Sequence, residues 1–344
     1  MHDPWRLPLR LQPVPVPRVW GGERILREIH RGLAATPPIG ETWEVSDVGD
    51  DPAIHSVIVE GPARGRTLRQ LIESDPRPLL GEGVLASSGS QPRLPLLFKY
   101  IDARETLSVQ VHPSDRTLRE LGLPGRGKSE AWLILDADAG ATVIYGFEPG
   151  WDLKRSITRA RLGEGGEGLR RVPVHRGDAI SLPAGVVHAI GKGILLAEIQ
   201  QSSDITYRIH DWDRLGLDGR PRALHLEEAA RVTPPQLLPP CPLPAPKASP
   251  GREWIPRIEE PHFSVRELRA AAAGLPFPHS GDRFAIFALL AGEASIEAEG
   301  GERIHAARGD TLLFPAAAGP CRLAAGDDAW ALWMEPGIPR SAAD

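Results

Sequence analysis

Proline and glycine are frequent along the whole chain, and they restrict the folds that it can adopt. Of its 344 residues, 36 are Gly and 35 are Pro, about a fifth of the chain and well above average usage. Both residues break helices, which argues against a helical bundle. The remaining composition, 41% hydrophobic and 25% charged, is that of a globular protein. We therefore expect a mostly β protein of short strands joined by tight turns, with a few short helices.

Charge and cysteine content exclude several classes of protein. The formal net charge is −5 and no basic stripe stands out, so we expect no nucleic-acid partner. The two cysteines, Cys241 and Cys321, form no C-x-x-C pair, which excludes a disulfide framework and a cysteine-rich zinc site. Pro interrupts the first 17 residues, and no segment has the apolar length of a membrane span. We expect a cytoplasmic protein with no membrane partner.

Alternation of apolar and polar residues marks the expected strands. The pattern predicts strands over 41–48, 53–60, 130–135 and 141–147, two strands within 94–112, and several within 172–209. Short helices are expected over 67–73, where Thr67 can cap the first turn, and over 115–121. Residues 81–93 are rich in Gly and Ser and are expected to form a loop.

A proline-dense stretch, 234–250, divides the chain, because its prolines forbid both helix and central strand. We expect a first domain over 1–235, a linker over 236–255 and a second, smaller domain over 256–344. An internal echo supports two related β units: RGDAISLPAG at 176–185 resembles RGDTLLFPAA at 308–317.

Four side chains form a candidate metal site. In a strand, Gln110 and His112 point to the same face because they are two residues apart. Glu130 begins a later strand, and His188 follows the turn at Pro183-Ala184-Gly185. Together they make a mixed nitrogen and oxygen set suited to a divalent cation, for which zinc is the first choice. Each histidine alone could be an ordinary strand residue, but the joint arrangement favours the metal site.

These motifs resemble those of a known family. Gly177-x5-Pro183-x-Gly185-x2-His188 matches the second cupin motif, and Gln110-x-His112 with Glu130 is similar to the first. Further stretches are similar in sequence and order to those of the type I mannose-6-phosphate isomerases, a family of the cupin superfamily. The resemblance is to the short bacterial form of this family. The stretches are GETWEVS (40–46), LSVQVHP (107–113), KSE (128–130) and EIQQSSDITYR (198–208).

The resemblance implies a cupin (jelly-roll) β-barrel and one catalytic metal per chain, usually Zn2+. It also implies a small-molecule sugar phosphate as substrate, interconverted between mannose 6-phosphate and fructose 6-phosphate. Carried over by motif, the metal ligands are Gln110, His112, Glu130 and His188. By the same resemblance, Arg208 is the active-site arginine, and Ser108 and Lys128 line the substrate pocket.

Two departures from the family pattern limit what the resemblance carries over. Gly127 stands where longer family members have His, so no role for that side chain transfers. In the second copy of the motif, Pro320 stands at the position that corresponds to His188 in the first copy. We therefore expect a degenerate cupin-like second domain without metal.

An aldose–ketose exchange needs a group that moves a proton between two carbons and a group that stabilises negative charge. Lys128 is the candidate base, since it shares the strand face of Glu130 and a neighbouring metal would favour its neutral form. Arg208 either binds the substrate phosphate or steadies the charge at the reacting carbons. Ser108 and Lys99 are further candidates for substrate binding.

Three other functions remain open at this stage. An iron-dependent cupin oxygenase would use the same ligand types, although two His and one carboxylate are more usual there. A phosphosugar-binding cupin without catalytic activity, or an enzyme for another sugar phosphate, would also keep these residues. The chain is expected to act as a monomer or a homodimer.

Overall fold

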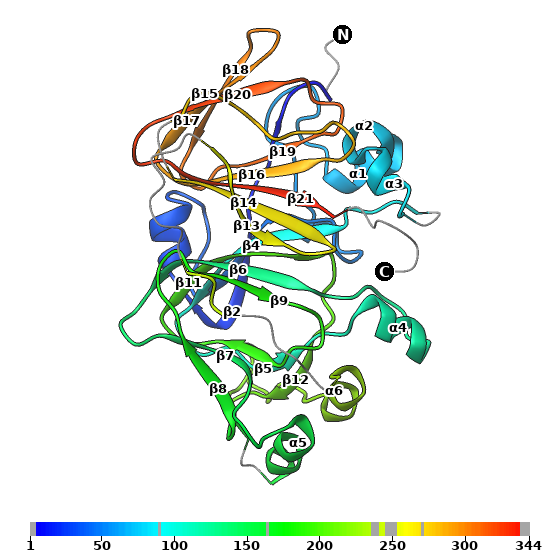
Figure 1. The fold of residues 1–344 in the computed structure, drawn as a ribbon, viewed down its shortest axis with the longest axis vertical. Helices are drawn as coiled ribbons and strands as arrows, with labels where there is room; N and C mark the ends of the chain where they lie inside the picture. The colour runs from blue at the N-terminus through cyan, green and yellow to red at the C-terminus, as the bar shows by residue number, and fades with distance from the viewer. Residues whose placement is uncertain are drawn as a thin grey trace.

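The computed structural model describes residues 5–88, 91–162, 165–234, 241–244, 253–269 and 272–337. Within them the protein is built from four sheets stacked in layers, with antiparallel pairing between neighbouring strands (Figure 1). We number the sheets 1 to 4 from the bottom of Figure 1 to the top. The expected mostly β fold with few helices is confirmed.

Sheets 1 and 2 form the lower half of the molecule. Sheet 1 has the order β12 (Tyr207–His210), β5 (Val109–Val111), β10 (His188–Ile190), β7 (Thr142–Phe147) and β8 (Leu169–Pro173). Sheet 2 has the order β2 (Val14–Gly22), β3 (Ile39–Val45), β4 (Leu96–Ala103), β11 (Ile194–Gln201), β6 (Glu130–Ala137) and β9 (Ala179–Leu182).

Sheets 3 and 4 form the upper half. Sheet 3 has the order β1 (Leu9–Arg10), β19 (Thr311–Phe314), β16 (Ala285–Ala291), β21 (Trp330–Pro336), β14 (Phe263–Arg269) and β13 (Ile255–Glu259). Sheet 4 has the order β15 (Ala272–Pro276), β20 (Cys321–Ala325), β17 (Glu293–Ala298) and β18 (Arg303–Ala307).

The helices are short and lie at the edges. They are η1 (Ile25–Ile29), η2 (Pro52–Ile54), α1 (Leu68–Ser74), α2 (Pro76–Leu80), α3 (Glu82–Leu85), α4 (Asp115–Leu121), α5 (Leu153–Arg161) and α6 (Leu226–Val232). No helix in the described part of the chain is long and apolar enough to cross a membrane. Both predicted helices are confirmed: Thr67 closes a capping box on α1, and Ser114 caps α4.

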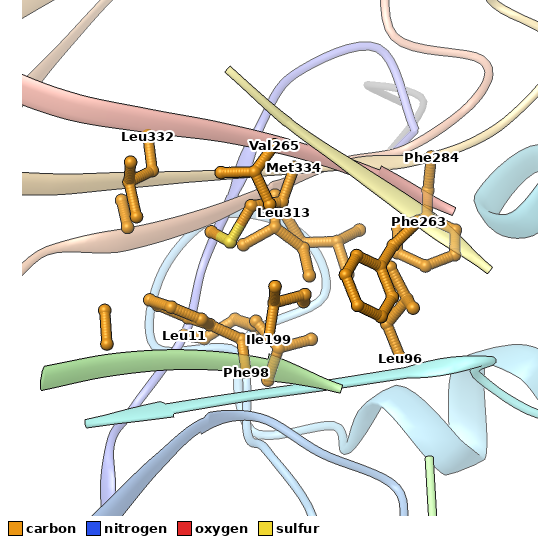
Figure 2. Packing of buried hydrophobic residues seen from close by; sticks show 14 of the residues in the cluster. Leu11, Leu96, Phe98, Ile199, Phe263, Val265, Phe284, Leu313, Leu332 and Met334 are labelled. Carbon is orange, nitrogen blue, oxygen red and sulfur yellow. The ribbon is translucent and has the colours of Figure 1, made fainter. Parts of the chain in front are cut away.

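Apart from β2, the strands of sheet 2 are buried on both faces along most of their length. Accordingly β4, β6, β9 and β11 have mostly apolar sequences. On β6, Leu133 packs upward against sheet 3, whereas Trp132 and Ile134 pack downward against sheet 1. Figure 2 shows the upper of these two interfaces, where Phe98 and Ile199 of sheet 2 face Val265 and other side chains of sheet 3. The lower interface is the core that surrounds the candidate metal site.

The two halves share more than this core. β1 belongs to sheet 3, where Leu9 pairs with Leu313, although it comes from the start of the chain. Leu79 of α2 accepts a hydrogen bond from the backbone of Ala316 at 3.0 Å. The division at 235 and 255 stays a prediction, and most of the linker lies outside the described residues.

The rings of Trp254, Phe277, Phe287, Phe314 and Trp333 cluster in the core of the upper half.

Two local predictions were wrong. Residues 53–60 are not a strand: Asp51 caps the 3-10 helix η2, and only isolated bridges follow, at Val57 and Ile58. Residues 81–93 are not wholly a loop, because α3 occupies 82–85; residues 89–90 lie outside the described part.

Candidate metal centre

The candidate ligands converge in the space between sheets 1 and 2, which we call the lower lumen. Val109 and Val111 of β5 pack outward against α6, so Gln110 between them faces the lumen. His188 is the direct partner of Gln110 across the β5–β10 pair. His112 follows β5, and Glu130 enters from sheet 2 as the first residue of β6. Three chain segments therefore bring the four predicted ligands to one place.

Three of these ligands form a compact, buried triad. Ligand atoms of His112, Glu130 and His188 all lie within 4.8 Å of one another. The Nε2 atom of His188 lies 3.1 Å from Glu130 Oε1, and that of His112 lies 3.5 Å from Glu130 Oε2. Each side chain is at most 2% exposed. Two imidazoles and a carboxylate at this spacing suit a zinc-type ion.

Backbone carbonyls set the orientation of both imidazoles. His112 donates from Nδ1 to the carbonyl of Ile205 at 2.7 Å, and His188 donates from Nδ1 to Val186 at 2.8 Å. A proton held on Nδ1 leaves Nε2 as the atom that carries the lone pair, and both Nε2 atoms lie beside Glu130. This outer layer of hydrogen bonds is the arrangement that metal-binding histidines use, so the residues fit a metal.

Gln110 lies beside the triad with its amide nitrogen, not its oxygen, nearest His188. Nε2 of Gln110 is 3.4 Å from His188 Nε2, while its oxygen accepts a hydrogen bond from Ser108 Oγ at 3.4 Å. Rotation of the amide by half a turn would present the oxygen, which is the metal-binding atom of this side chain. Ser108 itself is buried, so it contacts Gln110 and not solvent.

Lys128 is a buried member of the centre. Its ammonium lies 2.8 Å from Glu130 Oε2 and 3.1 Å from His112 Nε2. Burial alone would raise the pKa of Glu130, but the charge of Lys128, with smaller contributions from the neighbouring His188 and His112, holds it well below its usual range. Burial and Lys128 together hold the pKa of His112 well below its usual range, which keeps this imidazole neutral. A carboxylate and a neutral imidazole are the ionisation states that metal ligation requires.

Lys99 is buried in sheet 2, where it forms an ion pair rather than facing solvent. Its ammonium lies 2.6 Å from Glu198 Oε2, and Glu198 Oε1 accepts from the indole of Trp132 at 2.7 Å. Although burial lowers the pKa of Lys99, Glu198 and then Glu41 raise it above its ordinary value. Lys99 is thus a fixed cation on the lumen wall.

Arg208 lies next to Gln110 across the β12–β5 pair, on the lumen face of sheet 1. Its guanidinium donates to the carbonyl of Ala223 at 3.0 Å, and it pairs with neither Asp211 nor Asp213. Asp211 instead accepts from Arg214 at 2.8 Å and from Arg222 at 2.5 Å. Burial and the neighbouring cations, Arg222 first, lower the pKa of Arg208.

Sequence reasoning gave no role to Glu198, Asp211, Arg214 or Arg222. Glu198 carries a usable signal, since it is a charged residue that follows an apolar run in a strand buried on both faces. Asp211, Arg214 and Arg222 come together only when the segment between β12 and α6 folds. Their spacing in the sequence does not predict this contact.

Comparisons with known proteins find one family of similar sequences. The sequence pattern of "Phosphomannose isomerase type I, catalytic domain" matches residues 9–123. The mannose-6-phosphate isomerase of Streptococcus mutans is 34% identical over 311 residues, which cover 90% of this chain and 92% of that protein. A mannose-6-phosphate isomerase of Bacillus subtilis is 40% identical over 227 residues, or 65% of this chain and 67% of that protein.

Solved structures give the same result for the fold. The crystal structure of the mannose 6-phosphate isomerase from Bacillus subtilis superposes with a TM-score of 0.75 at 27% identity, covering 95% of this chain and 99% of that one. The apo form of the Salmonella typhimurium mannose 6-phosphate isomerase superposes with a TM-score of 0.67 at 18% identity, covering 96% and 99%. At that identity the second structure supports the fold alone.

Proposed function

Because the chain belongs to the type I phosphomannose isomerase family, we propose that it interconverts mannose 6-phosphate and fructose 6-phosphate in a metal-dependent reaction. The observation that carries this proposal is the buried triad of His112, Glu130 and His188, with the Lys128 ammonium in contact with two of its members. The family and the site thus point to the same chemistry.

Zinc is the metal that we propose, one ion per chain, held by His112, Glu130, His188 and the rotated amide of Gln110. Two imidazoles and a carboxylate within one compact, buried site support zinc over magnesium or calcium, which prefer oxygen ligands. When bound, the ion would supply Lewis-acid stabilisation of the negative charge that develops on the sugar oxygens.

Lys128 is the group that we propose to move the proton. In the forward direction its amine, once deprotonated, takes the proton from C2 of open-chain mannose 6-phosphate and returns it to C1 through an enediolate, while the proton of the C2 hydroxyl moves to the C1 oxygen. Burial among His112 and Glu130 excludes bulk water from this transfer. Ser108 and Lys99 line the same lumen and are proposed to hold the sugar chain.

Arg208 and its neighbours are proposed to hold the phosphate. Three guanidinium groups, from Arg208, Arg214 and Arg222, gather around Asp211. Even with Glu105, which lies 3.8 Å from Arg214, positive charge exceeds negative charge in this group. A phosphate monoester carries a charge of about −1.5 to −2 at neutral pH and would balance the excess. Guanidinium binds its oxygens in pairs.

The test is conversion of mannose 6-phosphate to fructose 6-phosphate in a coupled assay, with mannose as the matched control. We expect turnover of the phosphorylated sugar and a kcat/KM about a hundredfold or more lower for mannose, because the phosphate contributes binding energy remote from the reacting carbons. Absence of turnover by zinc-loaded protein would contradict the proposal. Binding without turnover would then indicate a sensing protein, and turnover of another sugar phosphate would indicate a different substrate.

A further inference from the structure

Gln200 is a buried side chain in the lower lumen that the proposed reaction does not use. It lies on β11 and is fully buried. Its neighbour Ile199 packs upward in the core between sheets 2 and 3, so Gln200 faces downward into the lumen. Across the β11–β6 pair its direct partner is Glu130, a member of the metal triad. Gln200 therefore forms part of the wall beside the reacting centre.

The amide of Gln200 has a fixed orientation. Its Nε2 donates both protons to backbone carbonyls, to Gln201 at 2.9 Å and to Ser203 at 2.7 Å. Exchange of the amide nitrogen and oxygen would break both hydrogen bonds, which settles the assignment. Oε1 is therefore held in one place, and it has no hydrogen-bond partner within the described residues. Buried carbonyl oxygens are nearly always paired, so this exception needs an explanation.

The polar side chains at the start of the adjoining strand β6 do not supply the missing donor. Glu130, opposite Gln200, is a carboxylate and can only accept. Lys128 is engaged with His112 and Glu130, and the Trp132 indole donates to Glu198. A hydroxyl group of a molecule bound beside Glu130 is the donor that fits, because it is neutral and small and would satisfy a fixed acceptor that is otherwise buried without a partner.

We propose that Gln200 Oε1 accepts a hydrogen bond from a hydroxyl of the bound sugar phosphate, and so contributes to recognition of the polyol chain. This inference rests on the proposed function, which places an open-chain sugar phosphate in the lumen. The hydroxyl belongs to C3, C4 or C5, since O1 and O2 take part in the reaction. A site that holds an acceptor in place discriminates against an analogue that lacks the donor.

The experiment measures binding, which does not depend on turnover. The probe is mannitol 6-phosphate, the reduced form of mannose 6-phosphate, titrated calorimetrically into zinc-loaded protein. We compare wild type, Gln200→Met, which removes the acceptor at similar volume, and Ile199→Val, a control on the same strand that faces the other core. We expect Gln200→Met to weaken binding about tenfold and Ile199→Val to leave it unchanged.

Three monodeoxy versions of the probe, lacking the C3, C4 or C5 hydroxyl, locate the contact without relying on any variant. We expect wild type to bind one of these analogues about tenfold more weakly than the parent probe. We expect Gln200→Met to bind that analogue and the parent probe equally tightly. If the role of Gln200 is purely structural, Gln200→Met lowers the melting temperature or the zinc content. The variant then still binds that deoxy analogue more weakly than the parent probe. If wild type binds all three analogues like the parent probe, the inference is overturned.

The same data separate this inference from the proposed function. Binding that depends on Gln200, in a protein that does not convert mannose 6-phosphate, supports the contact and overturns the isomerase proposal. Conversion of mannose 6-phosphate, together with binding that does not depend on Gln200, supports the isomerase proposal and overturns the Gln200 contact.

Discussion

Lys128 is the single residue whose placement most affects the proposed chemistry. The sequence leaves it open whether this lysine lies at the surface, but the structure buries it against His112 and Glu130. A lysine in such a setting has to be either a structural partner of the carboxylate or a proton carrier. The two roles differ in what their loss does to turnover.

Lys128→Met should therefore lower kcat by a factor of about 10² to 10⁴, the usual contribution of a general base, while KM changes little. Steady-state kinetics with mannose 6-phosphate, together with zinc analysis of the variant, provide the measurement. Lys192→Met is the matched control, because Lys192 is exposed. Turnover near the wild-type value in zinc-replete Lys128→Met would rule out the base assignment.

At this scale the sequence indicates which residues meet but not how their polar atoms pair. Gln110 and His112 follow from strand periodicity, and Glu130 and His188 from their motifs. The ion pair of Lys99 with Glu198 depends on the register of β4 against β11, two strands about a hundred residues apart. That register is set by the packing of both faces of sheet 2, which local sequence does not encode.

Among the elements, a buried ion pair joins both halves of the molecule. His30, which ends η1, contacts Glu44 of β3 at 2.8 Å, and Thr311 of β19 donates to the same carboxylate at 3.3 Å. Burial lowers the pKa of His30, but Glu44 first and then Asp310 raise it above its ordinary value. The protonated imidazole is thus favoured by folding, and it ties sheet 2 to sheet 3.

This pair predicts a pH-dependent contribution to stability. A raised pKa in the folded state stabilises the protein fully below the unfolded pKa of His, about 6.5, and the contribution disappears as pH rises through the folded pKa. His30→Gln should cost about 2 kcal/mol of unfolding free energy at pH 5.5–6, the worth of a hydrogen bond to a charged group, and less at pH 9. Denaturant unfolding at both pH values, with exposed His305→Gln as control, measures the difference. An equal cost at both values would contradict the assignment.

Elements with strong local signals are predicted well, and those formed by tertiary contacts are not. Thr67 and Gln70 specify the start of α1 by their own hydrogen bonds, so sequence alone locates that helix. Over 53–60 the alternation is that of a strand, yet the segment is held by bridges from Val57 to Thr67 and from Ile58 to Leu11. The helices α5 and α6 were missed because only two residues of each are buried, so each offers few apolar residues for a pattern to register.

The whole molecule is a stack of four sheets in which sheet 2 serves two cores at once. Its lower face carries Lys99, Glu130 and Glu198, and its upper face packs against sheet 3 (Figure 1). The upper half therefore supports the strands that carry the site. This arrangement was only partly predictable: the repeated motif indicates two β units, but not that β1 crosses into sheet 3.

The central claim is that one metal ion in the lower lumen enables the isomerisation. The most direct measurement is to strip the protein with a chelator, add zinc in small steps, and follow mannose 6-phosphate turnover against the metal content at each step. Activity should rise linearly and stop rising at one zinc per chain, since the triad offers one site. Undiminished turnover by protein shown to be free of metal would contradict the account.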